Sequence, residues 1–186
     1  MSLSFAATVW RYGVTKLDTA LAPPAARQLA ELLAVRGLRM ATAESCTGGW
    51  LAKVLTDLAG SSVWYERGWV TYSNAAKQAD LGVPAELLAA HGAVSEAVVK
   101  AMAMGALERA AVDIAVAVSG VAGPTGASEA KPVGTVWLAW AWRAAGSVQT
   151  HALPMWFAGD REAVRWQAVI SALNGLLETL ARLPAE

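Results

Sequence analysis

The sequence predicts a single domain of the α/β class, a three-layer α/β/α sandwich built on a mixed β-sheet. Segments typical of helices and strands alternate over most of the chain, which favours parallel strands joined by helices. Two strand-like segments with a short turn between them follow, which adds an antiparallel hairpin to the sheet. With 186 residues, the chain is long enough to bury a substantial core.

The first four predicted elements are helices and strands in alternation. Residues 23–37 predict a helix, because a proline pair begins it, leucines recur at helical spacing and a glycine ends it. Residues 39–44 predict a short strand, and residues 48–58 predict a helix that begins at two glycines. The aromatic and β-branched residues within 63–73 predict a second strand, interrupted near Gly68.

Three helices and a buried strand come next. Residues 74–81 predict a short helix with Asn74 as its N-cap, and residues 84–90 predict another. Ser95 is expected to cap a longer helix, whose apolar residues recur at helical spacing. The continuous apolar run 114–118 is typical of a strand that is covered on both faces.

The last third of the chain holds a loop, a hairpin and a helix. Residues 119–134 form a glycine-rich loop. The segments 135–143 and 148–154 predict a β-hairpin that turns near Gly146. Asp160 is the expected N-cap of the final helix, which carries its apolar residues on one side.

Charge and hydropathy exclude several classes of partner. Fifteen basic and fifteen acidic residues leave no formal net charge, which argues against a nucleic-acid binder that works by neutralising phosphates. No stretch reaches ~18 uninterrupted apolar residues, so we expect no transmembrane helix and no membrane partner. Residues 1–22 predict an extension of unclear structure ahead of the domain at 23–186. They show no secretory signal, because charges interrupt their apolar stretch.

The cysteine and histidine content points to a cytoplasmic protein without a metal. Cys46 is the only cysteine, so no intrachain disulfide forms and a cytoplasmic location is expected. His91 and His151 lie far apart in the sequence, which argues against a zinc site of cysteine and histidine ligands. The nine tryptophans either fill the core or form an aromatic-rich dimer surface.

The segment Ala-Glu-Ser-Cys-Thr-Gly-Gly at 43–49 is the first candidate site. A strand that ends near Ser45 and turns into a helix places this hydroxyl at the carboxyl edge of the sheet, where open α/β sheets bind ligands. The free N–H groups of the helix, with Gly48 and Gly49, favour a phosphate or an oxyanion there, and Thr47 is expected to cap the helix. The alternative is a tight turn with caps and no ligand.

The segment Thr-Tyr-Ser-Asn-Ala-Ala-Lys at 71–77 supplies a phenol and an amine. Within one helix, Tyr72 and Lys77 would lie about 140° apart. If Tyr72 ends a strand and Asn74 caps a helix, both reach one point, with Lys77 near position N3. The helix dipole and burial would then both lower the pKa of Lys77 and favour a neutral, basic amine. The alternatives are a solvated surface lysine and an ordinary strand tyrosine.

Two further features leave alternatives open. The loop 119–134 lacks Gly-Lys-Ser/Thr, so it is no Walker A motif, but its backbone amides suit a substrate; otherwise it is a flexible crossover. Cys46 is expected to be a buried structural thiol, since no partnering histidine is evident in the sequence.

Several ordered blocks of the chain together resemble the CinA C-terminal domain family, the nicotinamide-nucleotide amidases. The resemblance covers about residues 25–180. Ser119-Gly120 replaces the Thr-Gly that is usual in the family, and a hydroxyl is retained. The matching blocks are residues 41–49, 60–62, 72–74, 77, 81–83, 92–95, 120–124, 131–136 and 159–161.

The resemblance implies a cytoplasmic bacterial enzyme of pyridine nucleotide salvage. Such an enzyme converts nicotinamide mononucleotide to nicotinic acid mononucleotide and ammonia, needs no cofactor and is commonly a homodimer of the three-layer α/β fold. The family's serine, tyrosine and lysine fall on Ser45, Tyr72 and Lys77. The substrate-binding candidates are Thr47, Gly48, Gly49, Asn74, Ser119, Gly120, Gly123 and Arg161.

The mechanism expected from these residues is a serine acyl-enzyme. Ser45 attacks the carboxamide carbon, and either Lys77 or a Tyr72 phenolate assisted by Lys77 takes its proton. The sequence leaves open whether N–H groups near Ser45 or those of the 119–124 loop hold the oxyanion. It also leaves open whether the phosphate lies at the helix corner, with Thr47, Gly48 and Gly49, or at Arg161, the weaker candidate.

Two rival functions remain on the sequence alone. One is a non-catalytic module that binds a nucleotide. The other is a serine hydrolase of the β-lactamase type acting on another amide, because Tyr72-Ser73-Asn74 resembles a Tyr-x-Asn element. Against the second, no lysine stands three residues after Ser45 and no Lys-Thr-Gly is present.

Overall fold

Five strands form one mixed sheet in the order β2-β1-β3-β4-β5 in a computed structural model, which describes residues 22–144 and 146–183. β1 runs parallel to its neighbours β2 and β3, whereas β3, β4 and β5 are antiparallel. The predicted mixed sheet with a terminal hairpin is therefore confirmed. The strands are β1 (Met40–Glu44), β2 (Tyr65–Val70), β3 (Ile114–Gly120), β4 (Thr135–Ala144) and β5 (Ser147–Trp156).

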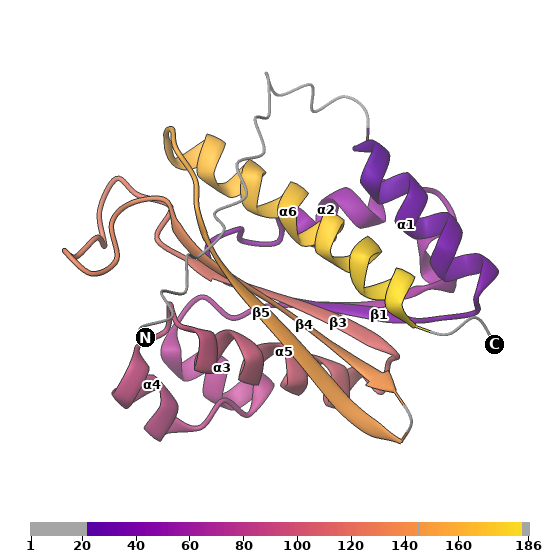
Figure 1. The fold of residues 1–186 in the computed structure, drawn as a ribbon, viewed down its shortest axis with the longest axis horizontal. Helices are drawn as coiled ribbons and strands as arrows, with labels where there is room; N and C mark the ends of the chain where they lie inside the picture. Colours follow the sequence, from indigo (N-terminus) through magenta and orange to yellow (C-terminus); the bar gives the residue numbers. More distant parts are fainter. Residues whose placement is uncertain (1–21, 145, 184–186) are drawn as a thin grey trace, which may run out of the picture.

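Helices cover both faces of the sheet, as the three-layer prediction requires (Figure 1). One face carries α1 (Pro24–Val35), α2 (Trp50–Thr56) and α6 (Arg161–Arg182). The other face carries α3 (Asn74–Leu81), α4 (Ala85–His91) and α5 (Glu96–Ala110). A short 3-10 helix, Ser61–Val63, precedes β2.

The core is divided into two hydrophobic clusters, one on each face of the sheet. Alternate residues of β3 point to opposite faces, so Val116 and Val118 join the cluster under α1, α2 and α6. Ala115 and Ala117 join the cluster under α5. Small side chains on the α5 face let this helix pack close to the sheet, and burial of both clusters supplies the main driving force for folding.

Most predicted element boundaries hold within a few residues, with two informative differences. The predicted helix at 48–58 begins only at Trp50, because Gly48 and Gly49 have φ of 63° and 90° and form the turn before it. Asn74 as the N-cap of α3 was wrong. Ser73 holds the extended cap conformation, and its hydroxyl accepts a hydrogen bond from the Ala76 N–H. Ser95 and Asp160 are confirmed as N-caps.

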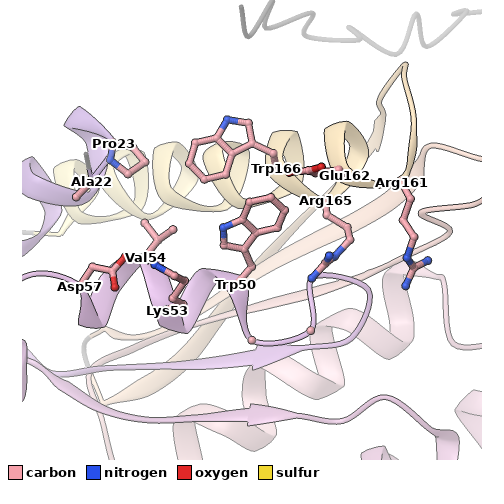
Figure 2. A pocket seen from close by; sticks show the side chains of 12 residues that line it. Ala22, Pro23, Trp50, Lys53, Val54, Asp57, Arg161, Glu162, Arg165 and Trp166 are labelled. Atoms are coloured by element: carbon pink, nitrogen blue, oxygen red, sulfur yellow. Dashed lines mark hydrogen bonds and ion pairs between the residues drawn. The ribbon is translucent and has the colours of Figure 1, made fainter. Parts of the chain in front are cut away.

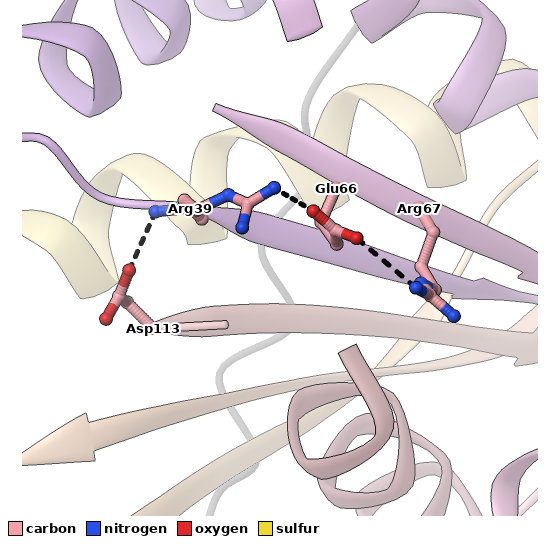
Figure 3. Close-up of polar contacts among 4 residues, drawn as sticks. All are labelled: Arg39, Glu66, Arg67 and Asp113. Carbon is pink, nitrogen blue, oxygen red and sulfur yellow. Dashed lines mark hydrogen bonds and ion pairs between the residues drawn. The ribbon is translucent and has the colours of Figure 1, made fainter. Parts of the chain in front are cut away.

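The amino ends of the parallel strands are joined by polar contacts (Figure 3). The Arg39 N–H donates to Asp113 at 2.8 Å, and Glu66 pairs with both Arg39 and Arg67. These ion pairs are largely exposed, so each contributes less than about 1 kcal/mol. The opposite, carboxyl edge of the parallel strands is left for a site.

The described ranges contain no helix with the length and hydropathy needed to span a bilayer. The predicted extension over residues 1–22 lies outside the described residues except for Ala22.

The close packing of α5 makes Gly105 a sensitive position. A Cβ at Gly105 would overlap the carbonyl oxygen of Leu81, which belongs to the backbone and cannot swing away. We expect Gly105→Ala to lower the free energy of unfolding by about 1–3 kcal/mol, although alanine is the better helix former. Urea unfolding followed by circular dichroism measures this.

The matched control is Met104→Ala on the exposed side of the same helix, which should change stability by less than about 1 kcal/mol. A Gly105→Ala protein as stable as the parent would show that α5 does not need this contact.

Candidate active site

A pocket of about 300 Å³ lies at the carboxyl edge of the sheet, beyond the ends of β1 and β3. The β1–α2 turn, the start of the loop after β3 and the first residue of α6 all contribute to it. Seven of the candidates named from the sequence line this pocket: Ser45, Tyr72, Lys77, Ser119, Gly120, Gly123 and Arg161. Four do not line it: Thr47, Gly48, Gly49 and Asn74.

The central contact of the pocket joins Lys77 to Ser45. The Lys77 Nζ lies 3.0 Å from the Ser45 Oγ and also donates to the Thr71 carbonyl oxygen at 2.6 Å. The lysine is 1% exposed, so the alternative of a solvated surface residue does not hold. None of the salt bridges among the described residues involves Lys77.

Burial lowers the pKa of Lys77, because the ammonium form loses its hydration. No carboxylate in residues 22–144 or 146–183 pairs with it to offset that loss. A neutral amine can keep its N–H bond to the Thr71 carbonyl while its lone pair accepts the Ser45 hydroxyl proton. The geometry therefore provides a serine next to a base.

Cys46 is buried beside this pair, as expected for a structural thiol. Its side chain is 5% exposed, and burial raises the pKa of the thiol to about 12. The thiolate is the nucleophilic form of cysteine, and this environment suppresses it. Ser45 is therefore the better nucleophile of the two neighbours.

Tyr72 lies at the mouth of the pocket and contacts Arg161 instead of the serine–lysine pair. Its side chain is 61% exposed, and its hydroxyl accepts a hydrogen bond from the Arg161 guanidinium at 3.0 Å. The same guanidinium donates to the Gly123 carbonyl oxygen at 2.8 Å. Arg161 thus connects three segments that are far apart in the sequence.

Ser119 and Asn74 have mainly structural contacts. The Ser119 hydroxyl donates to the Ala93 carbonyl at 2.8 Å and so holds the segment before α5 against the end of β3. Asn74 occupies the first turn of α3, and its carbonyl oxygen accepts from Gln78.

The amides at the start of α2 are occupied by Glu44. Its buried carboxylate accepts hydrogen bonds from the N–H groups of Gly49, Leu51 and Ala52 at 2.8 to 3.0 Å. The prediction that Thr47 caps this helix was wrong. Its hydroxyl is buried and has no hydrogen-bond partner among the described residues, because Glu44 already fills the cap.

The sequence reasoning missed three residues: Glu44, Thr71 and Arg165. Glu44 had a signal, since an acidic residue stands just ahead of a helix whose first turn needs acceptors. Thr71 acts through its backbone carbonyl, which no side-chain pattern reveals. Arg165 donates to the carbonyl oxygens of Cys46 and Thr47 at 3.1 and 2.6 Å, from more than one hundred residues away.

Comparison with known proteins places this arrangement in a family. Residues 23–180 match the family model described as the CinA C-terminal domain. The chain belongs to the CinA C-terminal domain family. The chain is 56% identical to the nicotinamide-nucleotide amidohydrolase PncC of Escherichia coli K12 over 149 residues, which are 80% of this chain and 88% of that protein. It is 54% identical to the PncC of Pseudomonas putida, covering 82% and 93% of the two chains.

Solved structures of the family share the fold. The competence damage-inducible protein A of Klebsiella pneumoniae MGH 78578 superposes with a TM-score of 0.81 at 49% identity, over 86% of this chain and 97% of that one. The competence/damage inducible protein CihA of Agrobacterium tumefaciens gives a TM-score of 0.77 at 43% identity, over 87% and 99%.

The role of Glu44 can be tested by one substitution. Glu44→Gln keeps the shape but replaces one oxygen by an NH₂ group that faces backbone N–H donors. We expect the free energy of unfolding to fall by about 1–3 kcal/mol, since buried donors lose their acceptor. Chemical denaturation measures this change.

Glu66→Gln serves as the control, because that carboxylate lies in a largely exposed ion-pair group and should cost less than about 1 kcal/mol. Equal losses in the two variants would contradict a special role for Glu44.

Proposed function

We propose that this chain is an amidohydrolase that converts nicotinamide mononucleotide to nicotinic acid mononucleotide and ammonia through a serine acyl-enzyme. The observation that carries the mechanism is the 3.0 Å contact between the Ser45 hydroxyl and the buried amine of Lys77. The names of the PncC relatives, at 54 to 56% identity over most of both chains, support the substrate.

Acylation begins when the Ser45 Oγ attacks the carboxamide carbon and its proton passes to the neutral Lys77 amine. The negative charge that develops on the carbonyl oxygen needs donors in the pocket. The Ala122 and Gly123 N–H groups are candidates, because neither has an acceptor among the described backbone hydrogen bonds. The Lys77 ammonium then protonates the amide nitrogen, the C–N bond breaks and ammonia leaves.

Deacylation uses the same groups in reverse. Lys77, neutral again, takes a proton from a water molecule that attacks the acyl carbon, and then returns a proton to the Ser45 oxygen. We assign the base to Lys77 and not to Tyr72, because Lys77 contacts Ser45 and Tyr72 contacts Arg161. Tyr72 is then a residue that positions the nucleotide.

The substrate phosphate is assigned to Arg161. The helix corner at Gly48 and Gly49 is a poorer site, since the Glu44 carboxylate occupies its amides and would repel an anion. Arg161 lies at the mouth of the pocket. Its guanidinium has five N–H donors, and the hydrogen bonds to Gly123 and Tyr72 leave some of them for a phosphate.

A homodimer, a cytoplasmic location and a role in pyridine nucleotide salvage remain predictions that rest on the family resemblance. A non-catalytic nucleotide-binding module and a β-lactamase-like hydrolase are the alternative outcomes of the experiments below.

Replacing the nucleophile gives the first test. Ser45→Ala should lower ammonia release from nicotinamide mononucleotide by about 10³-fold or more, since the covalent route is lost. Release is measured with a coupled ammonia assay on protein treated with a chelator, and calorimetry checks that the nucleotide still binds.

Ser147→Ala, on the exposed edge strand, is the matched control and should retain the parent rate. An unchanged rate of ammonia release by the Ser45→Ala protein would contradict the serine mechanism. Tight binding without any release by the parent protein would favour a binding module, and hydrolysis of a chromogenic β-lactam would favour the other rival.

The lowered pKa of Lys77 predicts a pH dependence. The base must be neutral, so kcat/KM should be low when the amine is protonated and should rise as the pH increases through the lowered pKa. Lys77→Met should abolish activity at every pH. The same substitution should raise the free energy of unfolding, because the folded protein no longer has to bury an amine that loses its hydration.

The sign for stability follows from linkage. The amine binds its proton less tightly in the folded protein, so the unfolded chain holds more protons between the two pKa values and stability rises with pH there. Lys77→Met should remove that rise. Lys100→Met on α5 is the control and should leave the pH dependence of kcat/KM and of the free energy of unfolding unchanged. A rate independent of pH across this window would contradict the assignment of Lys77 as base.

A further inference from the structure

A second pocket, larger than the one at Ser45, lies on the face of the sheet that carries α1, α2 and α6 (Figure 2). Its volume is about 600 Å³. Among the described residues, Arg161 alone lines both pockets. The β1–α2 turn separates them, since Ser45 and Cys46 line the first pocket and Gly48 and Gly49 line the second. We call this pocket the Trp50 slot; it is lined by Ala22, Pro23, Gly48, Gly49, Trp50, Lys53, Val54, Asp57, Arg161, Glu162, Arg165 and Trp166.

One wall of the Trp50 slot is aromatic. The rings of Trp50 and Trp166 have centroids 5.3 Å apart at an angle of 37°. Trp166 is 7% exposed, so Trp50 supplies most of the ring surface and Trp166 supports it from behind. Figure 2 shows Pro23 and Val54 toward the opposite end from the arginines, on the α1 and α2 side of the indoles. Pockets with aromatic walls and a few polar groups of this volume are typical of sites for small molecules that contain a ring.

The two ends of the slot differ in charge. At one end, Lys53 and Asp57 pair with each other across one helical turn and largely cancel. At the other end, Arg161 and Arg165 come from successive turns of α6, with Glu162 as the only carboxylate among the lining residues there. This end therefore carries a net positive charge.

Arg165 is fixed in place and still has N–H donors to offer. Arg165 uses its Nε and Nη2 atoms on the Cys46 and Thr47 carbonyls, and its guanidinium lies 5.1 Å from the centroid of the Trp50 ring. A guanidinium has five N–H groups, so Arg165 keeps free donors, those on Nη1 among them, for an anion in the slot. The slot thus combines a surface for a ring with a cationic end.

We propose that the Trp50 slot is a second binding site, for an aromatic anion of nucleotide size. The ring lies against the indole of Trp50, behind which Trp166 packs. The anionic group faces Arg165, because both Nη atoms of Arg161 donate to residues of the Ser45 pocket. Arg165 also donates to the carbonyl oxygens of Cys46 and Thr47, in the turn that follows Ser45. A ligand bound to Arg165 therefore contacts a side chain that holds this turn in place. The binding does not depend on the proposed amidase activity.

The test uses adenosine 5′-monophosphate as the probe, titrated into the full chain by isothermal calorimetry. We expect one molecule to bind per chain, and Trp50→Leu to weaken the affinity by about tenfold or more, since stacking of a base on an aromatic ring is lost. Adenosine and inorganic phosphate should each bind more weakly than the nucleotide, because each retains only one half of the contacts.

Two further variants locate the site and guard against misfolding. Trp142→Leu removes another half-buried indole, opposite Ile114 at the far end of the sheet, and should leave the affinity unchanged. Glu162→Gln removes the exposed carboxylate at the cationic end and should tighten binding several-fold. Circular dichroism checks the fold of each variant.

The proposal is overturned if the probe does not bind at millimolar concentration, or if Trp50→Leu binds it as tightly as the parent. It is also overturned if inorganic phosphate alone matches the nucleotide, because an anion would then bind without the ring. No turnover is measured, so failure here is distinguishable from failure of the amidase proposal.

Discussion

The site depends on one interaction, the set of hydrogen bonds between the buried carboxylate of Glu44 and the first backbone N–H groups of α2. Glu44 is the last residue of β1, and its carboxylate accepts hydrogen bonds from three backbone N–H groups at the start of α2, so it satisfies donors that a helix otherwise leaves open. The strand, the turn and the helix are thereby locked together around Ser45, whose own N–H donates to the Val118 carbonyl at 2.9 Å. A buried charge is tolerated here because backbone donors surround it.

This cap also makes the start of α2 unfavourable for an anion. An uncapped helix start attracts phosphates, and the glycines at 48 and 49 would let one approach closely. With Glu44 in place, the same corner carries a negative charge and no free first-turn donors among Gly49, Leu51 and Ala52. The cationic groups near the turn are Arg161 and Arg165, which come from the first turns of α6, far along the sequence from Gly48 and Gly49.

Lys77 departs from ordinary packing rules in a way that suits a base. Lysine is rarely buried, and within the described part of the chain the amine hydrogen-bonds only to a hydroxyl and a carbonyl oxygen. Such a position costs folding free energy, and the lowered pKa is the expression of that cost. Sites where local stability is sacrificed in this manner are commonly functional.

Much of the fold was readable from the sequence, because periodicity and caps are local signals. The buried run at 114–118, the caps Ser95 and Asp160 and the hairpin turn all lie within a few residues of the elements they specify. The candidate nucleophile, Ser45, and the two alternative bases, Lys77 and Tyr72, could be named for the same reason, since a strand end and a helix start can be recognised in short segments.

Only the tertiary structure decided which groups meet. Ser73 instead of Asn74 caps α3, and Glu44 instead of Thr47 caps α2, because several nearby side chains compete for the same N–H groups and backbone geometry selects one. The contact of Lys77 with Ser45, and those of Arg161 and Arg165, join residues 32 to 119 positions apart. Packing of the helices on the sheet sets these distances, and no local pattern in the sequence encodes them.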